Sequence, residues 1–293
     1  MFVLKYKDRY PVKQMCRVLK ISESGYYRWL RNRNKPTGSK LLAVEIQNIL
    51  EEHPDHHNYG AGRMRLALKQ KGIQKSLRTV QRIMSEMGLT HKKRVPHGIT
   101  KATTEIQERE NLIKRDFSAV EPMKKLLSDI TEIQCADKKL YVSAVLDCFN
   151  GEIVALTMDD NMKKELCIRT VTELKERYGK LEGTIFHSDR GSQYTSEAFR
   201  EALHDIGLVQ SLSGTGHCYD NARMESFFAT LKKEKIYQIA AYRLKSEEVK
   251  TIIFRYVYIY YNRLRVYTAN PNGYPPEVYR NQTLSRRSTP PAA

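Results

Sequence analysis

The sequence predicts an α/β domain, built on a mixed five-stranded sheet with flanking helices, that is preceded by all-α helix-turn-helix units. Two observations support this fold class. Amphipathic helical spacing interrupted by tight turns fills the chain up to about residue 95. Apolar runs rich in β-branched residues begin near residue 126 and continue as strand, strand, strand, helix, strand, helix, strand, helix. That order describes a mixed sheet covered by helices.

The composition is that of a globular protein with more than one domain. The chain has 293 residues, of which 41% are hydrophobic and 28% charged, so it is neither wholly disordered nor fibrous. It contains neither the apolar core of a signal peptide nor an apolar run long enough to span a bilayer. Five cysteines without a C-x-x-C pair support neither a disulfide framework nor a zinc site. We expect a cytoplasmic protein with no membrane partner.

Positive charge is concentrated in the N-terminal part of the chain. The formal net charge is +17, from 50 Lys and Arg against 33 Asp and Glu. Residues 1–120 hold 25 of the basic and 11 of the acidic side chains, whereas residues 121–293 are nearly balanced. Double-stranded DNA is the expected partner, because neutralising phosphates drives binding that is independent of sequence.

Two helix-turn-helix units are expected in this basic part, over residues 1–35 and 36–95, followed by a connector over 96–124. In the second unit, Ser76 is a candidate cap for a helix whose apolar stripe faces inward. Cations on the outer faces are expected to contact phosphates. The bland alternative is that they are solvated side chains of a helical bundle. The cations assigned to DNA are Arg63, Arg65, Lys75, Arg78 and Arg82.

A catalytic core is predicted over residues 125–240, with a C-terminal helix and tail over 241–293. Three apolar runs, 126–133, 139–148 and 152–158, are separated by turn signals and predict an antiparallel meander. A long helix is expected from about Asp220 to Tyr237. Tyrosines between residues 256 and 261 could stack on bases, although such density on a helix is more typical of packing.

Three acidic residues of the core are candidates for chemistry. Asp129 lies within an apolar strand, where an unpaired charge is costly. Asp189 ends another strand, at the sheet edge where sites are usually built. At 100° per residue, the expected helix directs Asn221, Glu225 and Lys232 along one line.

Converging carboxylates repel one another unless divalent cations neutralise them, and hard oxygen ligands suit Mg²⁺ or Mn²⁺. Two such ions would support phosphoryl transfer. Lys232 and Asn221 are expected to contact DNA, with the lysine gripping a phosphate. For any single acid, a solvated or salt-bridged side chain is the ordinary interpretation. Only the joint placement of Asp129, Asp189 and Glu225 indicates a metal site.

The spacing and the surrounding motifs resemble a known family. Between the three acids lie 59 and 35 residues, which is similar to the D, D(35)E pattern of retroviral integrases and bacterial transposases. The neighbouring segments are similar to the OrfB transposase subunit of insertion sequence family three. The similar segments are residues 62–90, 128–131, 187–194 and 220–228, together with Leu231, Lys232, Glu234, Tyr260, Tyr261, Asn262, Arg265, Pro276 and Tyr279.

This resemblance implies a ribonuclease H-like catalytic domain in which Asp129, Asp189 and Glu225 bind two Mg²⁺ or Mn²⁺ ions. It implies DNA strand cleavage and strand transfer at the ends of an insertion sequence. It further implies a homo-oligomeric synaptic complex, an accessory OrfA-type protein from an upstream frame, and association with the bacterial nucleoid on DNA. Two alternatives remain: a catalytically inactive, domesticated transposase acting as a DNA-binding regulator, and a ribonuclease for RNA–DNA hybrids.

Overall fold

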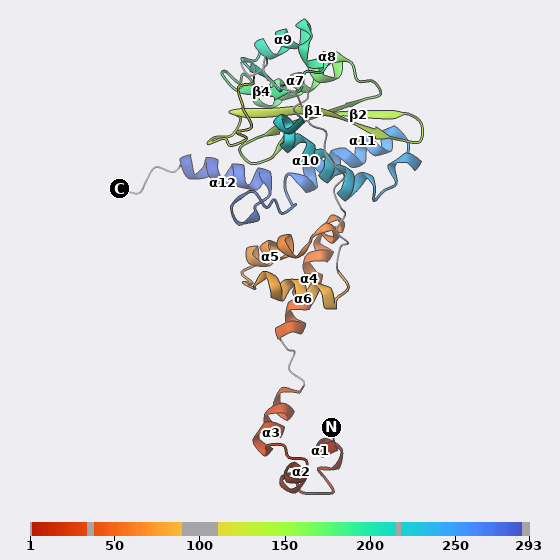
Figure 1. Cartoon of the computed structure of the whole chain (residues 1–293), viewed down its shortest axis with the longest axis vertical. Helices are drawn as coiled ribbons and strands as arrows, with labels where there is room; N and C mark the ends of the chain where they lie inside the picture. The colour runs from red at the N-terminus through yellow and green to blue at the C-terminus, as the bar shows by residue number, and fades with distance from the viewer. Residues whose placement is uncertain (1, 34–37, 90–110, 215–217, 289–293) are drawn as a thin grey trace, which may run out of the picture.

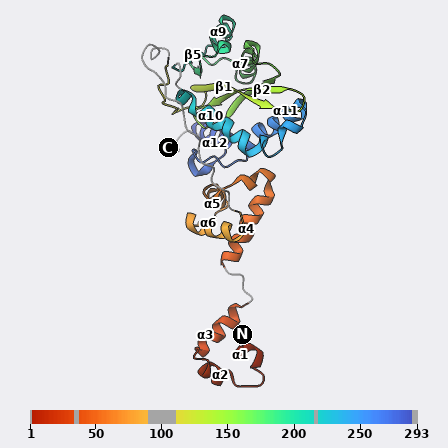
Figure 2. The ribbon, with the colours of Figure 1, turned by 45° about the vertical axis from the view of Figure 1, so that its right-hand side comes forward.

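The computed structural model describes residues 2–33, 38–89, 111–214 and 218–288. Three parts follow one another along the long axis of the molecule, as Figures 1 and 2 show from two directions. They are a small N-terminal helical unit, a second helical unit, and a sheet with helices on both faces. Among the described residues, no helix is long and apolar enough to cross a membrane.

The N-terminal unit consists of three short helices around a small core. Its helices are α1 (Phe2–Tyr6), α2 (Val12–Val18) and α3 (Glu23–Asn32). Ser22 begins α3 as its N-cap, where the hydroxyl accepts a hydrogen bond from the amide of Gly25 at 3.0 Å. Met15 and Tyr26 are buried between α2 and α3. This pairing of helices matches the helix-turn-helix pattern predicted near the start of the chain.

The second unit contains three α-helices and a 3₁₀ turn. These are α4 (Gly38–Glu52), η1 (Pro54–Asn58), α5 (Ala61–Gln70) and α6 (Leu77–Glu86). The Ser76 hydroxyl accepts a hydrogen bond from the Thr79 amide at 3.2 Å and so caps α6 as expected. The buried stripe of α6 consists of Val80, Ile83 and Met84. Of the connector predicted over 96–124, residues 96–110 lie outside the described residues.

The sheet has five strands in the order β3-β2-β1-β4-β5. The strands are β1 (Lys125–Gln134), β2 (Lys139–Asp147), β3 (Ile153–Asp159), β4 (Ile185–Ser188) and β5 (Val209–Leu212). The first three form the predicted antiparallel meander, and β4 and β5 add to β1 in parallel. The helices between strands are α7 (Lys164–Tyr178), α8 (Ser192–Thr195) and α9 (Glu197–His204). The fold is therefore the predicted mixed, ribonuclease H-like α/β sheet.

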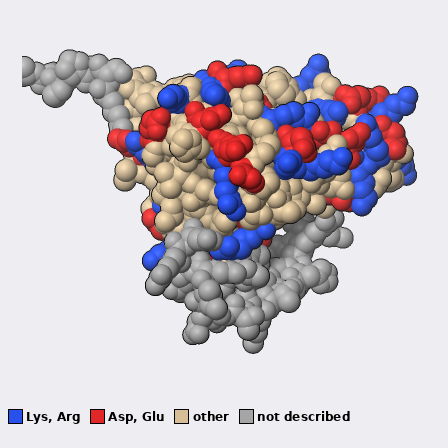
Figure 3. Space-filling view, turned by 90° about the horizontal axis from the view of Figure 1, so that it is seen from above, with Lys and Arg blue, Asp and Glu red and all other residues tan. Residues whose placement is uncertain are grey.

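Helices cover both faces of this sheet (Figure 1). Alternation along β2 directs Val145 into one core, with α7 and α9, and Leu146 into the other. The second core lies under α10 (Ala222–Leu231), α11 (Ser246–Arg255) and the π-helical η5 (Tyr256–Tyr261). Seen from the end opposite the N-terminal helices, the described surface carries cations and anions interspersed (Figure 3).

The helix expected from Asp220 to Tyr237 divides into three segments. A 3₁₀ turn, η2 (Cys218–Asn221), precedes α10, and a π-helical turn, η3 (Lys232–Ile236), follows it. The remaining C-terminal elements are η4 (Ala241–Arg243), η6 (Pro271–Gly273) and α12 (Pro276–Ser288). A uniform rotation of 100° per residue therefore applies only within α10.

The second helical unit is joined to the part that contains the sheet by a buried polar junction. Arg63 on α5 donates a 2.7 Å hydrogen bond to Glu234 on η3, which also accepts two from Arg265. Lys235 and Asp55 form an ion pair at 3.0 Å. Apolar side chains of α4, α5 and α6 belong to the same continuous core as those of β2 and α10. The two parts therefore pack as one body.

Candidate active site

Strand pairing brings Asp129 and Asp189 to equivalent positions on neighbouring strands. Leu127 of β1 lies opposite His187 of β4 in a parallel register. Asp129 comes two residues after Leu127, and Asp189 comes two residues after His187. Because side chains alternate along a strand, Asp129 is directed to the same face of the sheet as Leu127, and Asp189 directly follows β4, near enough for its charge to raise the pKa of Asp129. Asp129 is partly buried within β1, whereas Asp189 is exposed just beyond the end of β4.

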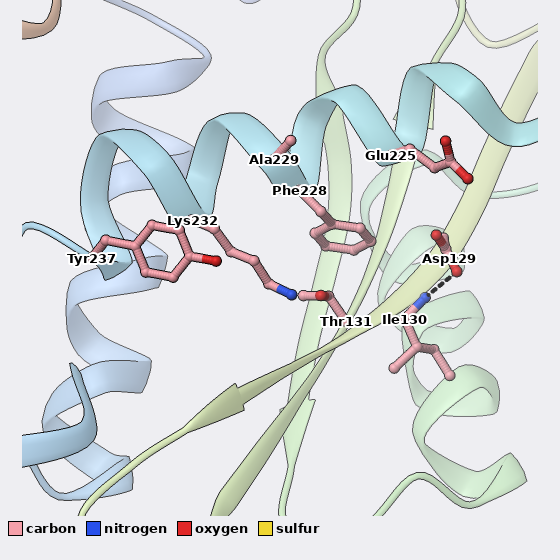
Figure 4. Close-up of a pocket in the computed structure, with 8 residues that line it drawn as sticks. All are labelled: Asp129, Ile130, Thr131, Glu225, Phe228, Ala229, Lys232 and Tyr237. Carbon is pink, nitrogen blue, oxygen red and sulfur yellow. Dashed lines mark hydrogen bonds between the residues drawn. The ribbon is translucent and has the colours of Figure 1, made fainter. Parts of the chain in front are cut away.

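Glu225 reaches this place from α10, which packs across β1. Asp129 and Glu225 line a cavity of about 390 Å³. In Figure 4 the two carboxylates lie near each other, and Lys232 extends from the next turns of the same helical segment toward Thr131. The buried stripe of α10 fixes this orientation, since Met224, Phe227, Phe228 and Leu231 face the core.

Burial is the main influence on the ionisation of Asp129, and negative charge from its neighbours adds to it. Burial raises the pKa of Asp129 to about 7, and repulsion from Asp189 and Glu225 adds to this effect. The Ile130 amide, which donates to Asp129 at 2.8 Å, and the nearby Lys232 ammonium lower the same pKa without restoring it. The charges of Asp189 and Glu225 therefore reach Asp129 through space.

The three carboxylates are not arranged around a single point. In the described part of the chain, no group of three His, Cys, Asp or Glu side chains is placed to hold a metal ion. Asp189 does not line the cavity, and its carboxylate instead accepts a 3.0 Å hydrogen bond from the Gly191 amide. Nevertheless, the donor set suits a divalent cation, because carboxylate oxygens are hard ligands and because burial, together with repulsion from Asp189 and Glu225, raises the pKa of Asp129.

Asn221 does not lie on the helix face that the projection gave it, because it precedes α10, and its contact with DNA stays a prediction. It precedes α10 with a φ of −122°, is only 5% exposed, and donates to the carbonyl of Ser128 at 3.0 Å. The projection failed because Asn221 lies outside the α-helix. It holds β1 at the residue before Asp129, so its place in the site is structural. Lys232 is half-buried and lines the cavity.

Other buried polar residues of the core form hydrogen bonds that hold the strand ends and loops in place. His187 is fully buried and its Nδ1 lies 2.8 Å from the hydroxyl of Ser211 on β5, so it orients the strand end. Asp147 accepts hydrogen bonds from the amides of Met123 and Phe149 and is likewise structural. Sequence reasoning missed Asp220, whose carboxylate is buried and accepts from Asn111, Arg115 and Gly214.

The cations assigned to DNA on the second helical unit differ in their surroundings. Arg65 on α5, and Lys75 and Arg78 at the start of α6, are exposed. Arg82 is exposed but pairs with Glu86 one turn away. Arg63 is directed inward to Glu234, and the expectation that it faces DNA is not supported by this placement. A charge partner 171 residues away leaves no local signal in the sequence.

The tyrosines between residues 256 and 261 are packing residues. Tyr256, Tyr258, Tyr260 and Tyr261 are at most 9% exposed. The hydroxyls of three of them donate to Glu234, Glu173 and the Asp55 carbonyl. A residue that sequence reasoning overlooked is Tyr237, which lines the cavity beside Lys232. Its five-residue separation from Lys232 indicates opposite helix faces unless the helix widens to a π-turn.

Known protein families match the second helical unit and the part that contains the sheet. Residues 119–218 and 225–284 match integrase core domains, and residues 39–97 match an HTH-like domain. The chain is 31% identical to InsK, named as a transposase of insertion sequence element IS150 in Escherichia coli K12, over 95% of this chain and 96% of InsK.

Two further relatives extend over similar lengths. Transposase InsF of insertion sequence IS3A from the same strain is 29% identical, over 97% of this chain and 99% of InsF. A 31 kDa protein of insertion element IS600 from Shigella sonnei is 32% identical, over 86% of this chain and 92% of its own length. With an integrase core, an HTH-like domain and relatives along nearly its whole length, the chain belongs to the IS3 family of insertion-sequence transposases.

Proposed function

We propose that this transposase cuts and joins DNA strands at insertion-sequence ends by metal-dependent phosphoryl transfer at Asp129, Asp189 and Glu225. One observation carries the proposal: two of these carboxylates line one cavity, and the third raises the pKa of Asp129 from the neighbouring strand. Hydrolysis of one phosphodiester would free a 3′-hydroxyl. Attack by that hydroxyl on a second phosphodiester would then expel its 3′-oxygen and join the strands.

The three carboxylates would hold two Mg²⁺ or Mn²⁺ ions. Such ions, when bound, supply Lewis-acid stabilisation for the attacking and leaving oxygens of an in-line displacement. The chain itself would position the DNA. Lys232 lies in the same cavity and would grip a phosphate oxygen as a point charge. Asn221 would keep Asp129 in place through its bond to the Ser128 carbonyl.

The helical units would supply most of the DNA affinity. Arg65, Lys75, Arg78 and Arg82 are exposed on the second unit, and residues 2–33 form the first. Two ends must be cut and joined together, so we propose a homo-oligomeric synaptic complex on double-stranded DNA. An OrfA-type protein from an upstream frame would complete it. The place of action would be the bacterial cytoplasm, at the nucleoid.

The test is cleavage and joining of labelled element-end DNA with Mg²⁺ or Mn²⁺ and the accessory protein. Asp189→Asn should abolish both reactions while DNA binding remains. Asp205→Asn, an exposed aspartate at the end of α9, is the matched control and should retain activity. Reaction products from Asp189→Asn at the wild-type rate would overturn the assignment. Binding without cleavage by the wild-type protein would favour the inactive regulator.

A further inference from the structure

A second cavity adjoins the one that holds the carboxylates. It has a volume of about 320 Å³, and it shares Lys232 and Tyr237 with the first. The two cavities therefore form adjoining parts of one groove, which runs from Asp129 and Glu225 past Lys232 to Tyr242. We refer to it as the β1 groove.

One side of the β1 groove is the free part of a strand. The first cavity is lined by β1 at Asp129 to Thr131, and the second at Glu132 to Gln134. Strand β4 pairs with β1 only over Lys125–Leu127, so within the described chain this stretch has no β4 partner along that edge.

The opposite side of the groove owes its shape to the π-helical turn η3. In an α-helix, residues five apart are turned by about 140° from each other. In η3 the Tyr237 amide instead donates to the Lys232 carbonyl at 2.9 Å, which closes a wider turn. As a result, both side chains face the same cavity, and Figure 4 shows the Tyr237 ring beside the Lys232 side chain.

Two exposed aromatic rings line the groove together with Lys232, and further cations lie next to it. Tyr237 is 63% exposed and Tyr242 is 57% exposed, in contrast to the buried tyrosines of η5. The guanidinium of Arg243 lies over the Tyr242 ring, 5.3 Å from its centroid. Lys233, next to Lys232, is exposed as well. Aromatic faces beside cations are the means by which proteins bind single-stranded nucleic acid without sequence preference.

We propose that the β1 groove binds unpaired nucleotides of the DNA strand next to the phosphodiester being cut. Their bases stack on Tyr237 and Tyr242, and a phosphate between them contacts Lys232. A base can lie flat against a tyrosine ring only after it has left the duplex stack. This inference rests on the proposed function, because it places the groove beside the reacting phosphate.

The test measures binding of duplexes with and without an unpaired tail, using the full chain with Asp189→Asn to prevent cleavage. A tail carrying 2-aminopurine should be quenched on binding. Tyr237→Ala and Tyr242→Ala should each weaken the binding of tailed DNA by roughly tenfold. Tyr237→Phe and Tyr242→Phe, which keep the ring, should stay within about twofold of the parent. Binding of blunt duplex should not change in any of them.

Phe254→Ala is the matched control, because Phe254 is 52% exposed on α11 and lines a different cavity. It should bind tailed DNA like the parent. Equal loss for blunt and tailed DNA, equal loss in Phe254→Ala, or an unquenched tail would overturn the proposal. Thermal unfolding of each variant verifies that it is folded.

The design also separates this inference from the proposed function. Tail binding that requires both tyrosines, in a wild-type protein that never cuts DNA, would support the groove and contradict the proposed chemistry. Cleavage by a protein that shows no preference for tailed DNA would support the proposed chemistry and contradict the proposed role of the groove. A tail preference confined to element-end duplexes assigns the nucleotides to the cut end, whereas an equal preference on unrelated duplexes assigns them to the target.

Discussion

Glu234 and Arg265 form a doubly hydrogen-bonded ion pair in the interior of the protein. Arg265 donates from Nε at 2.8 Å and from Nη2 at 2.9 Å, and both side chains are at most 7% exposed. Arg63 and Tyr256 donate to the same carboxylate. Every oxygen of this buried carboxylate is therefore satisfied, which is the condition under which a buried ion pair is tolerated.

Removing the Glu234 charge should be strongly destabilising. Glu234→Gln leaves the Arg265 guanidinium buried without its counter-charge, and we expect the free energy of unfolding to fall by about 3 kcal/mol. Urea denaturation measures this change. The control is Glu86→Gln, which removes the exposed partner of Arg82 and should cost about 0.5 kcal/mol or less. Similar losses in the two variants would contradict the buried-pair argument.

The same carboxyl group predicts how stability depends on acidity. Burial by itself would raise the pKa of Glu234, but hydrogen bonds and charges from Arg265 and Arg63 outweigh it and lower the pKa from 4.5 to about 2. The group therefore stabilises the folded state fully above pH 4.5, and this contribution is lost as the pH falls toward 2. It amounts to ~3 kcal/mol. Unfolding free energies measured from pH 7 to 2 should decline less steeply in Glu234→Gln than in the wild type.

Arg63 and Arg65 should have opposite roles although only one residue separates them. Arg63→Ala removes a hydrogen-bonded ion-pair partner of Glu234 and should lower the free energy of unfolding by about 2 kcal/mol. Arg65→Ala, on the exposed face of α5, should leave stability within about 0.5 kcal/mol and weaken DNA binding. Denaturation and a DNA-binding titration on both variants test this. A stability loss confined to Arg65→Ala would refute it.

Lys232 should contribute one phosphate contact. Lys232→Gln is expected to weaken DNA binding for all sequences and to reduce the slope of log K against log salt by about 1. Binding isotherms at several salt concentrations give the slope. Lys180→Gln, whose side chain is 75% exposed between α7 and β4, is the control and should keep the wild-type slope. Identical slopes for Lys232→Gln and the wild type would remove Lys232 from the DNA surface.

Divalent ions should stabilise the protein through Asp129. Adding Mg²⁺ or Mn²⁺ to the wild type should raise its melting temperature, because a ligand of the folded state alone stabilises that state. Asp129→Asn should abolish this increase. It should also melt higher than the wild type without metal, since one of three mutually repelling charges is gone. Asp205→Asn should behave as the wild type, and an undiminished metal response in Asp129→Asn would argue against the site.

The sheet could be predicted from sequence because its signals are local, whereas the three carboxylates rest on their spacing and on the family resemblance and stay a prediction. β-branched runs and turn residues gave β1 to β3 to within one residue at most ends. The cap at Ser76 and the stripe of Val80, Ile83 and Met84 predicted α6 in the same way. Apolar alternation and spacing are sufficient for such elements because burial alone decides them.

What could not be predicted depends on partners distant in the chain. Nothing near Arg63 indicates a buried glutamate at position 234, so its charge was assigned to DNA. No feature of the η3 sequence indicates a π-turn. A prediction that assumes a regular α-helix therefore directs Tyr237 away from Lys232. Asn221 was misplaced for a related reason, because α10 begins at Ala222 and a projection extended beyond its end has no meaning.

Within the part of the chain that the structure describes, a shared apolar core joins the helical unit that we propose binds the duplex, formed by α4, α5 and α6, to the sheet that carries the carboxylates. The position of the cut is then fixed by its distance along the duplex from the bound site, and not by the base sequence at the cut. One base pair inserted between the gripped site and the cutting point would turn the scissile bond by about 34° around the duplex axis, at roughly 10.5 base pairs per turn. A rigid body cannot follow such a turn, so the spacing within each terminal repeat has to stay constant to the base pair.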